Sequence, residues 1–237
     1  MRRFTKRTGD IGGVASRLTR DLDANTKDII NLDEIELDDA ASDASASGRL
    51  RRNAQKLTWH DGNAARVFPV VLDRDVSSTT VSNTGAETSV YSFSVPANTL
   101  GTNRMIRLTM FGYYANTSAG AETFQVRVKY GATLIGLVSS ASIASDADNR
   151  IFTVKTDLSA LNATNAQASV TAYLMGQADT GSTGGGSDAT LLDNKISMHN
   201  AIAEDSTLAK TLEVTVQHGS AALTITAVVQ VVQVELT

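Results

Sequence analysis

From about residue 66 onward, apolar and polar residues alternate one by one along much of the chain. The alternation is clearest over residues 91–95, 123–130 and 211–217. A period of two places one face of a β-strand in a core and the other in water, so each stretch predicts a half-buried strand. Similar patterns and apolar runs of strand length predict further strands at 67–72, 104–114, 132–139, 150–156, 168–175 and 222–236.

Polar stretches rich in Gly, Asn, Ser and Pro separate the predicted strands. Turn-forming residues stand at 83–85, 96–98, 116–120 and 218–220. The sequence 129–134, with Gly131 inside it, predicts a tight hairpin. Many short strands without a helical period predict an all-β fold, and we expect a jelly-roll-like antiparallel β-sandwich.

Two of the predicted strands, 104–114 and 222–236, carry apolar residues on both faces. Such a strand needs a cover on each side, from another layer of the domain or from another subunit. A central position in the sandwich supplies both covers for the first strand. Because terminal strands often lie at a sheet edge, the last strand is instead predicted to form a subunit interface. The predicted interface residues are Val228, Val232, Val234 and Leu236.

Residues 176–206 show no period and open with a glycine-rich run, so we expect a long loop there. A connection of this length inside a compact domain is uncommon and usually functional or disordered. Two roles remain open: a recognition loop at an outward tip, or a packing element between subunits. The second is favoured because four apolar residues follow the glycines closely. They are Leu191, Leu192, Ile196 and Met198.

The chain changes character near Leu57. The first 56 residues hold 21 of the 46 charged residues (21 basic plus 25 acidic), and the charges are segregated: basic over 1–20, acidic over 21–43, and basic again from Arg49. Apolar residues at helical spacing predict a short helix around 13–23, marginal in isolation. This segment is either a solvated tail or an arm that orders on a partner of complementary charge.

We therefore divide the chain into a charged N-terminal anchoring arm, 1–56, and a β-sandwich domain, 57–237, which residues 57–66 enter as a hairpin or linker. The arm interpretation assigns anchoring to its basic residues. These are Arg2, Arg3, Lys6, Arg7, Arg17, Arg20, Arg49, Arg51 and Arg52.

Composition limits the possible functions. The chain has 237 residues, no cysteine and a net charge of −4. The mild negative charge argues against a dedicated nucleic-acid binder, and the lack of cysteine excludes a disulfide framework, a thiolate metal site and a cysteine nucleophile. No run of about 18 apolar residues is present, so no membrane insertion is expected. The basic start lacks the apolar stretch of a secretory signal.

No motif in the sequence predicts an enzyme. The three histidines, His60, His199 and His218, have no zinc-binding spacing. The glycine run at 184–186 lacks the Lys-Ser/Thr of a phosphate loop, and Ser187 stands in no nucleophile elbow. We therefore expect no catalytic residue, no metal and no cofactor.

Few aromatic residues are available for sugar binding. Trp59 stands just before turn-forming residues, and Tyr113 and Tyr114 end a predicted strand. Packing at a strand end is the favoured interpretation of all three. The alternative is that they contact a glycan.

One stretch has a more specific pattern. Gly48, Leu50, Lys56-Leu57 and Asp61-Gly62 stand at the spacing G-x-L-x(5)-K-L-x(3)-D-G. The stretch resembles a short hairpin of many phage fibre proteins, in which a strand turns at the polar middle and returns to a D-G turn. Residues 90–101, 104–113 and 124–131 look like the β-sandwich domain that recurs in phage head-fibre, decoration and tail-fibre proteins.

The resemblance covers about residues 47–135 and brings no catalytic residues with it. It implies a homotrimer in the bacteriophage virion, with the N-terminal arm bound to capsid or tail proteins and the β domain outward. Such a structural protein is assembled in the host cytoplasm. The alternative function is a host-surface carbohydrate-binding module of a phage fibre.

Overall fold

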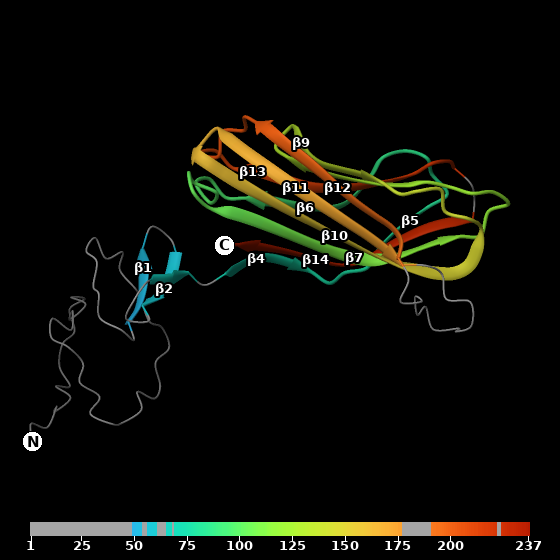
Figure 1. The fold of residues 1–237 in the computed structure, drawn as a ribbon, viewed down its shortest axis with the longest axis horizontal. Helices are drawn as coiled ribbons and strands as arrows, with labels where there is room; N and C mark the ends of the chain where they lie inside the picture. The colour runs from blue at the N-terminus through green and yellow to red at the C-terminus, as the bar shows by residue number, and fades with distance from the viewer. Residues whose placement is uncertain (1–48, 54–55, 61–64, 68, 177–190, 222–223) are drawn as a thin grey trace, which may run out of the picture.

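The structure is a computed structural model that describes residues 49–53, 56–60, 65–67, 69–176, 191–221 and 224–237. These residues form strands, turns and loops, without a helix among them. Two antiparallel sheets face each other in a sandwich, and a third, smaller sheet precedes them in the chain (Figure 1). The prediction of an all-β sandwich is confirmed. The helix expected around 13–23 lies outside the described residues.

The small N-terminal sheet contains the predicted hairpin. Its strands are β1 (Arg49–Asn53), β2 (Lys56–His60) and β3 (Ala65–Val67), in the order β1-β2-β3. Arg49 pairs with His60 and Asn53 with Lys56, so the chain reverses between residues 53 and 56, where the sequence pattern placed the turn.

The larger sheet of the sandwich has the order β12-β11-β10-β7-β14-β4, and β5 pairs with β14 beside β4. Its strands are β4 (Val70–Asp75), β5 (Thr79–Ser82), β7 (Met105–Asn116), β10 (Asp146–Ala163), β11 (Ala166–Gly176), β12 (Leu191–Ile202) and β14 (Ile225–Leu236). The smaller sheet has the order β6-β13-β8-β9. Its strands are β6 (Thr88–Val95), β8 (Phe124–Tyr130), β9 (Thr133–Ser139) and β13 (Lys210–His218).

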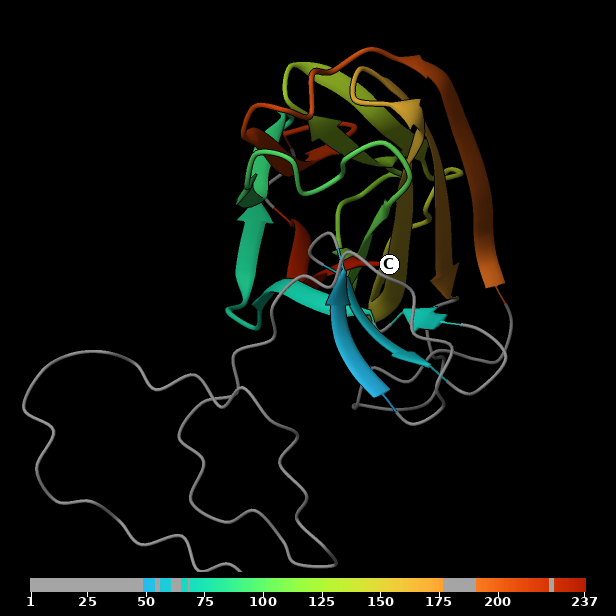
Figure 2. The same cartoon turned by 90° about the vertical axis from the view of Figure 1, so that its left-hand side faces the viewer.

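Side chains that point between the two sheets form one apolar core. The largest fully buried side chains include Tyr114, Phe124 and Phe152, whose rings pack in sequence with centroids 5.1 Å and 5.0 Å apart. The view along the strands shows the two layers on either side of this core (Figure 2). Burial of these apolar surfaces is the main stabilising contribution to the fold.

The last strand, β14, is not at an edge. It lies between β7 on one side and β4 and β5 on the other. A β-bulge between Val229 and Val231, with the exposed Gln230 as the extra residue, reverses which residues point inward. The inward residues are Ile225, Ala227 and Val229 before the bulge, and Val232, Val234 and Leu236 after it.

This bulge corrects the predicted subunit interface. Read without it, the sequence of β14 appears apolar on both faces; with it, Val232, Val234 and Leu236 share one buried face with the first half of the strand. Val228 is also buried within the chain, between Tyr113 of β7 and Thr80 of β5. We therefore reassign Val232, Val234 and Leu236 from a subunit interface to the core of one chain, while Val228 is buried within the chain on the opposite face of β14.

The two sheets are linked along both sides of the sandwich. On one side the Tyr91 hydroxyl of β6 donates to Asp73 of β4, at 2.6 Å. On the other side, polar side chains of the large sheet bind the free edge of β9: the amide of Leu137 donates to Ser197, and the Ser169 hydroxyl donates to the carbonyl of Ile135. Such contacts satisfy backbone groups that an uncovered edge strand would offer to other chains.

The sandwich has two distinct ends. At the near end, β4 begins beside the end of β14, where Val70 pairs with Leu236. At the far end, Asn116 pairs with both Ile225 and Asp146, and β11 ends beside the start of β12. With 12 residues, β7 spans about 40 Å between these ends. The chain therefore enters the sandwich and finishes at the near end (Figure 1).

The predicted strands are all present, although β4 begins three residues later than the predicted 67–72. The hairpin at Gly131 is confirmed, and this glycine has φ +62°, which disfavours other residues. The prediction that 176–206 forms one aperiodic loop is wrong, because residues 191–202 form β12. The strand β5 was not predicted.

Candidate functional site

The outward face of the large sheet is the most unusual surface among the described residues. We call this surface, formed by the outward side chains of β7, β10, β11 and β12, the outer face. Its apolar members are Phe111, Ile151, Val170, Leu174, Ile196 and Met198. Ile196 and Met198 are 76% and 68% exposed, and the other four are 39–45% exposed.

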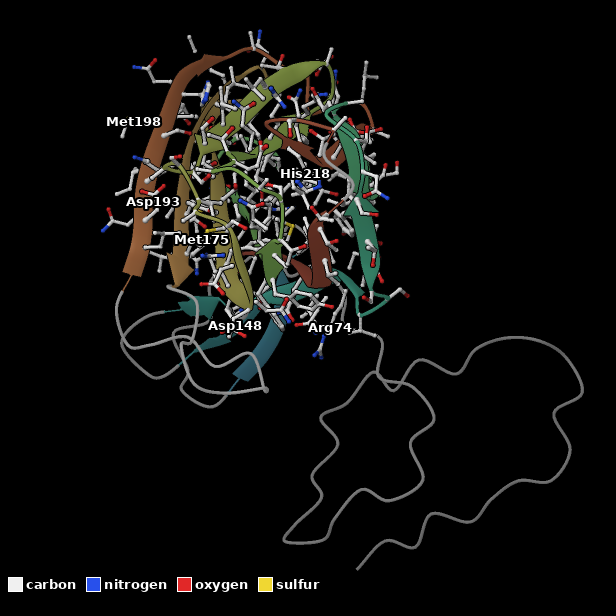
Figure 3. All side chains as sticks on the ribbon, turned by 90° about the vertical axis from the view of Figure 1, so that its right-hand side faces the viewer. Arg74, Asp148, Met175, Asp193, Met198 and His218 are labelled. Carbon is white, nitrogen blue, oxygen red and sulfur yellow. The ribbon has the colours of Figure 1, made fainter. Side chains whose placement is uncertain are left out.

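Antiparallel register places these side chains next to one another. Met198 lies opposite Val170, and Ile196 lies opposite Ala172. Residues opposite each other in adjacent strands have Cβ atoms about 5 Å apart and share one face. Leu174 continues the row through Thr153 to Phe111. Figure 3 shows Met198 on the outer side of β12, while His218 lies in the interior. The six side chains therefore share one face of the sheet, in which Thr153, Lys155 and Asp157 of β10 lie between those of β11 and β12 and those of β7.

The outer face has a shallow hollow and little unpaired charge. The hollow, with a cavity volume of about 450 Å³, lies between β11 and β12 and is lined by Ala172, Leu174 and Ile196 among others. Near the middle of the face, the guanidinium of Arg107 binds both carboxylate oxygens of Asp157, at 2.7 and 3.1 Å. This bond to Asp157 raises the pKa of Arg107.

The sequence found only part of this surface. Ile196 and Met198 were predicted as packing contacts between subunits, and the structure places both on the outer face. Leu192 instead packs partly against the core. The sequence did not predict the apolar residues that β7, β10 and β11 contribute to the outer face, because strand pairing brings these strands together from distant parts of the sequence. A signal was present in 195–199, where Ile196 and Met198 alternate with polar residues.

The predicted glycan-binding aromatic residues do not form one site. Tyr113 and Tyr114 are neighbours on β7 and therefore point to opposite faces of the sheet. Tyr113 lies half-buried on the outer face, whereas Tyr114 is fully buried beside Phe124 and His218. This corrects the assignment of Tyr114, which cannot contact a ligand. The backbone of Trp59 lies in β2, opposite Leu50 and Arg66.

The predicted anchoring residues lie largely outside the described part of the chain. Arg49, Arg51 and Arg52 lie in β1, opposite residues of β2. The other anchoring residues, Arg2, Arg3, Lys6, Arg7, Arg17 and Arg20, fall outside the described residues.

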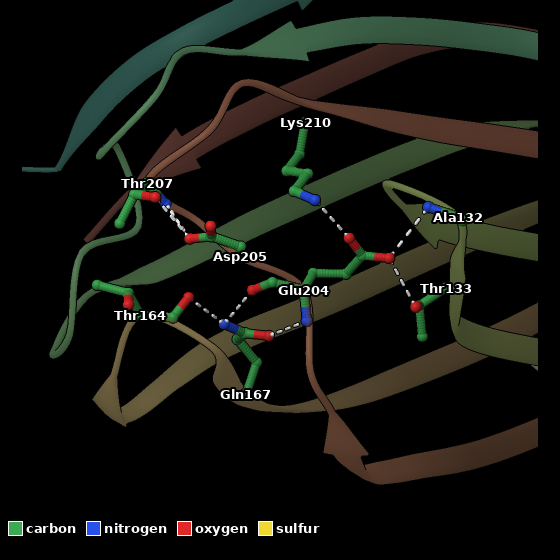
Figure 4. Close-up of polar contacts among 8 residues, drawn as sticks. All are labelled: Ala132, Thr133, Thr164, Gln167, Glu204, Asp205, Thr207 and Lys210. Carbon is green, nitrogen blue, oxygen red and sulfur yellow. Dashed lines mark hydrogen bonds and ion pairs between the residues drawn. The ribbon is translucent and has the colours of Figure 1, made fainter.

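Glu204 lies at the centre of a polar cluster at the near end (Figure 4). Its carboxylate accepts hydrogen bonds from Lys210 at 2.7 Å, from the Thr133 hydroxyl at 2.7 Å and from the Ala132 amide at 3.1 Å. Its backbone is bound to the side chain of Gln167. The cluster therefore joins the β8–β9 turn, the start of β11 and the connection from β12 to β13, which is a structural role.

Burial alone raises the pKa of Glu204, but the hydrogen bonds from Lys210, Thr133 and Ala132 lower it more, so the net pKa lies below its ordinary value of 4.5. A lowered pKa in the folded state adds stability above the unfolded pKa, and this stability is lost as the pH falls through the folded pKa. We therefore expect the stabilisation from Glu204 to be fully present at neutral pH and to be lost as the pH falls below the ordinary pKa of 4.5 and through the lower folded pKa.

Replacing Glu204 with Gln is expected to lower the free energy of unfolding at pH 7 by about 1.5–3 kcal/mol, because hydrogen bonds to a charged group are lost. Urea denaturation at several pH values measures this. The gap between the variant and the wild type should shrink in acid. Glu213→Gln is the matched control, because its Lys129 partner is 3.9 Å away and both side chains are about one third exposed, so little change is expected. Equal effects of the two substitutions would contradict the role of Glu204 in joining these three segments.

Other buried polar groups also serve the fold. A ring nitrogen of His218 lies 3.1 Å from the carbonyl of Val81, and burial lowers the pKa of this histidine. In the described part of the chain, no three His, Asp or Glu side chains are grouped so that they could hold a metal ion. The same residues include no helix that is long and apolar enough to cross a membrane.

Comparisons with known proteins give remote likenesses only. No protein-family model and no curated protein matches the chain. Among solved structures, it is similar to the CBM2 module of the evolved Dit of Lactobacillus casei BL23 phage J-1, with a TM-score of 0.32 and 10% identity over 61% of this chain and 67% of that one. It is also similar to a chain of infectious bursal disease virus, Gx strain, with a TM-score of 0.28 and 12% identity over 74% of this chain and 45% of that one. A third is a protein of unknown function from Shewanella oneidensis MR-1, with a TM-score of 0.31 and 12% identity over 71% and 74% of the two chains.

Proposed function

We propose that this chain is a non-enzymatic structural protein of a bacteriophage virion. It is a homotrimeric fibre or decoration protein, which residues 1–56 attach to capsid or tail proteins. It is assembled in the host cytoplasm and projects its β-sandwich from the particle. The resemblance of residues 47–135 to phage appendage proteins supports the class of protein, and the geometry of the sandwich supports the arrangement.

The main observation behind the proposed orientation is that the chain enters and leaves the sandwich at the same end. The arm and its hairpin precede β4, which starts at the near end, and β14 finishes there as well. The connections β7–β8, β9–β10 and β13–β14 lie at the far end, about 40 Å away. An attachment through the arm leaves the far end pointing away from the particle, as an appendage requires.

The connectivity supports a jelly-roll-like class for the sandwich. The first strands, β4 and β5, pair with the last, β14, and β6 pairs with the next to last, β13. Nested pairing of early with late strands across two sheets is the arrangement expected when a long hairpin is wrapped into a jelly roll.

The placement of polar groups supports a structural role over catalysis. The polar cluster around Glu204 and the hydrogen bond between Tyr91 and Asp73 connect strands to one another. The largest feature that the fold does not use is the outer face, which is an apolar surface rather than a cleft lined with reactive groups. Exposed apolar surfaces of this kind mark sites of protein association.

The test of this proposal is whether the chain is a stoichiometric component of particles. Quantitative mass spectrometry of gradient-purified virions is expected to find it at a fixed ratio to the major capsid or tail protein, and gold-labelled antibodies are expected to mark one location on the particle. Its absence from infectious particles would refute the virion role.

A further inference from the structure

We propose that the outer face is the surface through which copies of this chain associate, with the side chains of β11 and β12 at the centre of the contact. The inference deepens the homo-oligomeric state proposed above and is independent of whether the oligomer belongs to a virion. Its occupant is a second copy of the chain. Three properties of the face favour that occupant: its area, its charge and its position in the sheet.

The apolar area is of the size that an interface needs. The exposed parts of Phe111, Ile151, Val170, Leu174, Ile196 and Met198 together amount to on the order of 500 Å², near the upper end for a monomeric protein. A stable interface buries roughly 800 Å² on each partner, of which a little over half is apolar. The apolar area therefore accounts for the apolar share of one such contact, and the polar residues around it form the rim.

The charge of the face suits a neutral partner. Arg107 is bound to Asp157 and also lies near Glu235, so its charge is compensated within the face. Lys155 is exposed in the row between Thr109 and Ala172. A nucleic acid or a strongly charged protein requires a face of opposite sign. In a trimer, the near-neutral apolar faces of three copies can instead converge on the three-fold axis.

The most exposed apolar residues of the face lie on the outermost strand of the large sheet. Ile196 and Met198 lie on β12, the outermost strand of the large sheet, and their exposure exceeds that of Val170 and Leu174 on the adjacent strand. In the middle of β12 the inward side chains include polar residues that are used within the chain: Asp193 binds the Ala141 amide, and Ser197 binds the Leu137 amide. At the two ends of the strand, Leu192 and Ile202 pack toward the core. The exposed apolar side chains of Ile196 and Met198 therefore have no role within the chain, as is expected where a second chain covers the outward side.

The test compares the full-length wild-type chain with the double variant Ile196→Glu/Met198→Glu. We expect analytical ultracentrifugation to give a trimer for the wild type at micromolar concentration and a monomer for the double variant, with association weakened at least about a hundredfold. Because both side chains are exposed in one chain, the thermal unfolding of the dissociated variant should remain cooperative. Leu208→Glu is the matched control: Leu208 is 58% exposed but lies between β12 and β13, and this variant should remain a trimer.

The outcomes separate this inference from the proposed function. A double variant that remains a trimer would overturn the outer face as the contact and leave the homotrimer standing. A monomeric full-length wild type would overturn both the contact and the trimer, whereas the virion role is decided separately by particle composition. If deletion of residues 1–48 turns a monomeric wild type into a self-associating chain, the arm covers the face, and the inference is also wrong.

Discussion

Replacing Gly112 with valine is expected to prevent the sandwich from folding. Gly112 lies on β7 opposite Val229, beside the β-bulge of β14. A Cβ atom at this position would overlap the carbonyl oxygen of Val228, closer than side-chain contacts in proteins allow. Because β7 and β14 are both central strands of the large sheet, the clash cannot be relieved by moving an edge. We expect a loss of more than about 5 kcal/mol, which is comparable to the whole free energy of unfolding of a marginally stable domain.

Soluble yield, far-UV circular dichroism and urea denaturation measure this effect. Gly112→Ala should already be destabilising, because the overlap begins at the Cβ atom. Gly120→Ala is the control, since a Cβ there meets no atom within 4 Å, and it should leave the stability unchanged. A folded Gly112→Val protein of wild-type stability would show that β14 is not bulged against β7 as described.

The bulge also explains why the inward and outward faces of β14 could not be predicted from the sequence. Period-two alternation located most strands correctly, because a half-buried strand in a sandwich needs that pattern. In β14 the apolar residues change phase at Gln230, which gives the false impression of a strand with two apolar faces. A single extra residue leaves no distinct mark in the sequence, and its position depends on the glycine across the sheet at residue 112.

The strand β12 was missed for a different reason. Its alternation is inverted, with Asp193 and Ser197 inward and Ile196 and Met198 outward. Polar inward residues are expected only where a specific partner receives them. Here the partners are the Leu137 amide at the free edge of β9 and the Ala141 amide just after that strand. Sequence separation of about 60 residues between Leu137 and Ser197 hides this relation until the sheets are assembled.

The candidate site could be predicted only in part for the same reason. The sequence predicted two of its apolar members, Ile196 and Met198, as contacts between subunits, because they follow the glycine run closely. The others come from strands whose pairing is set by the whole sheet, so the shared face emerges only from the register of β7, β10, β11 and β12. The residues of β14 that were predicted to form the interface are instead buried within one chain, and the contact between copies that we propose lies on the outer face.

Removing residues 1–43 is expected to leave a folded, self-associated β domain that does not join virions. The first strand among the described residues begins at Arg49, and neither sheet of the sandwich uses a residue before Val70. The removed segment carries basic residues over 1–20 and acidic residues over 21–43, a pattern suited to a partner surface of complementary charge. Complementation of a phage that lacks this gene measures the effect. The truncated chain should be present in the lysate but fall to background in purified particles.

We propose that the charge of the arm, rather than its length, is what attaches the chain to the particle. A variant that keeps the whole arm tests this. Exchange of Arg2, Arg3, Lys6, Arg7, Arg17 and Arg20 for Gln keeps the arm but removes its basic group, and incorporation is expected to fall as it does for the deletion. Ala at Thr5, Thr8, Ser16 and Thr19 changes the same segment without changing its charge and should have no effect. Because exposed charge pairs weaken with salt, loss of wild-type protein from particles washed at high ionic strength is a further expected result. Normal incorporation of the truncated chain would refute anchoring by the arm, and normal incorporation of the Gln variant alone would move the attachment to the acidic stretch 21–43.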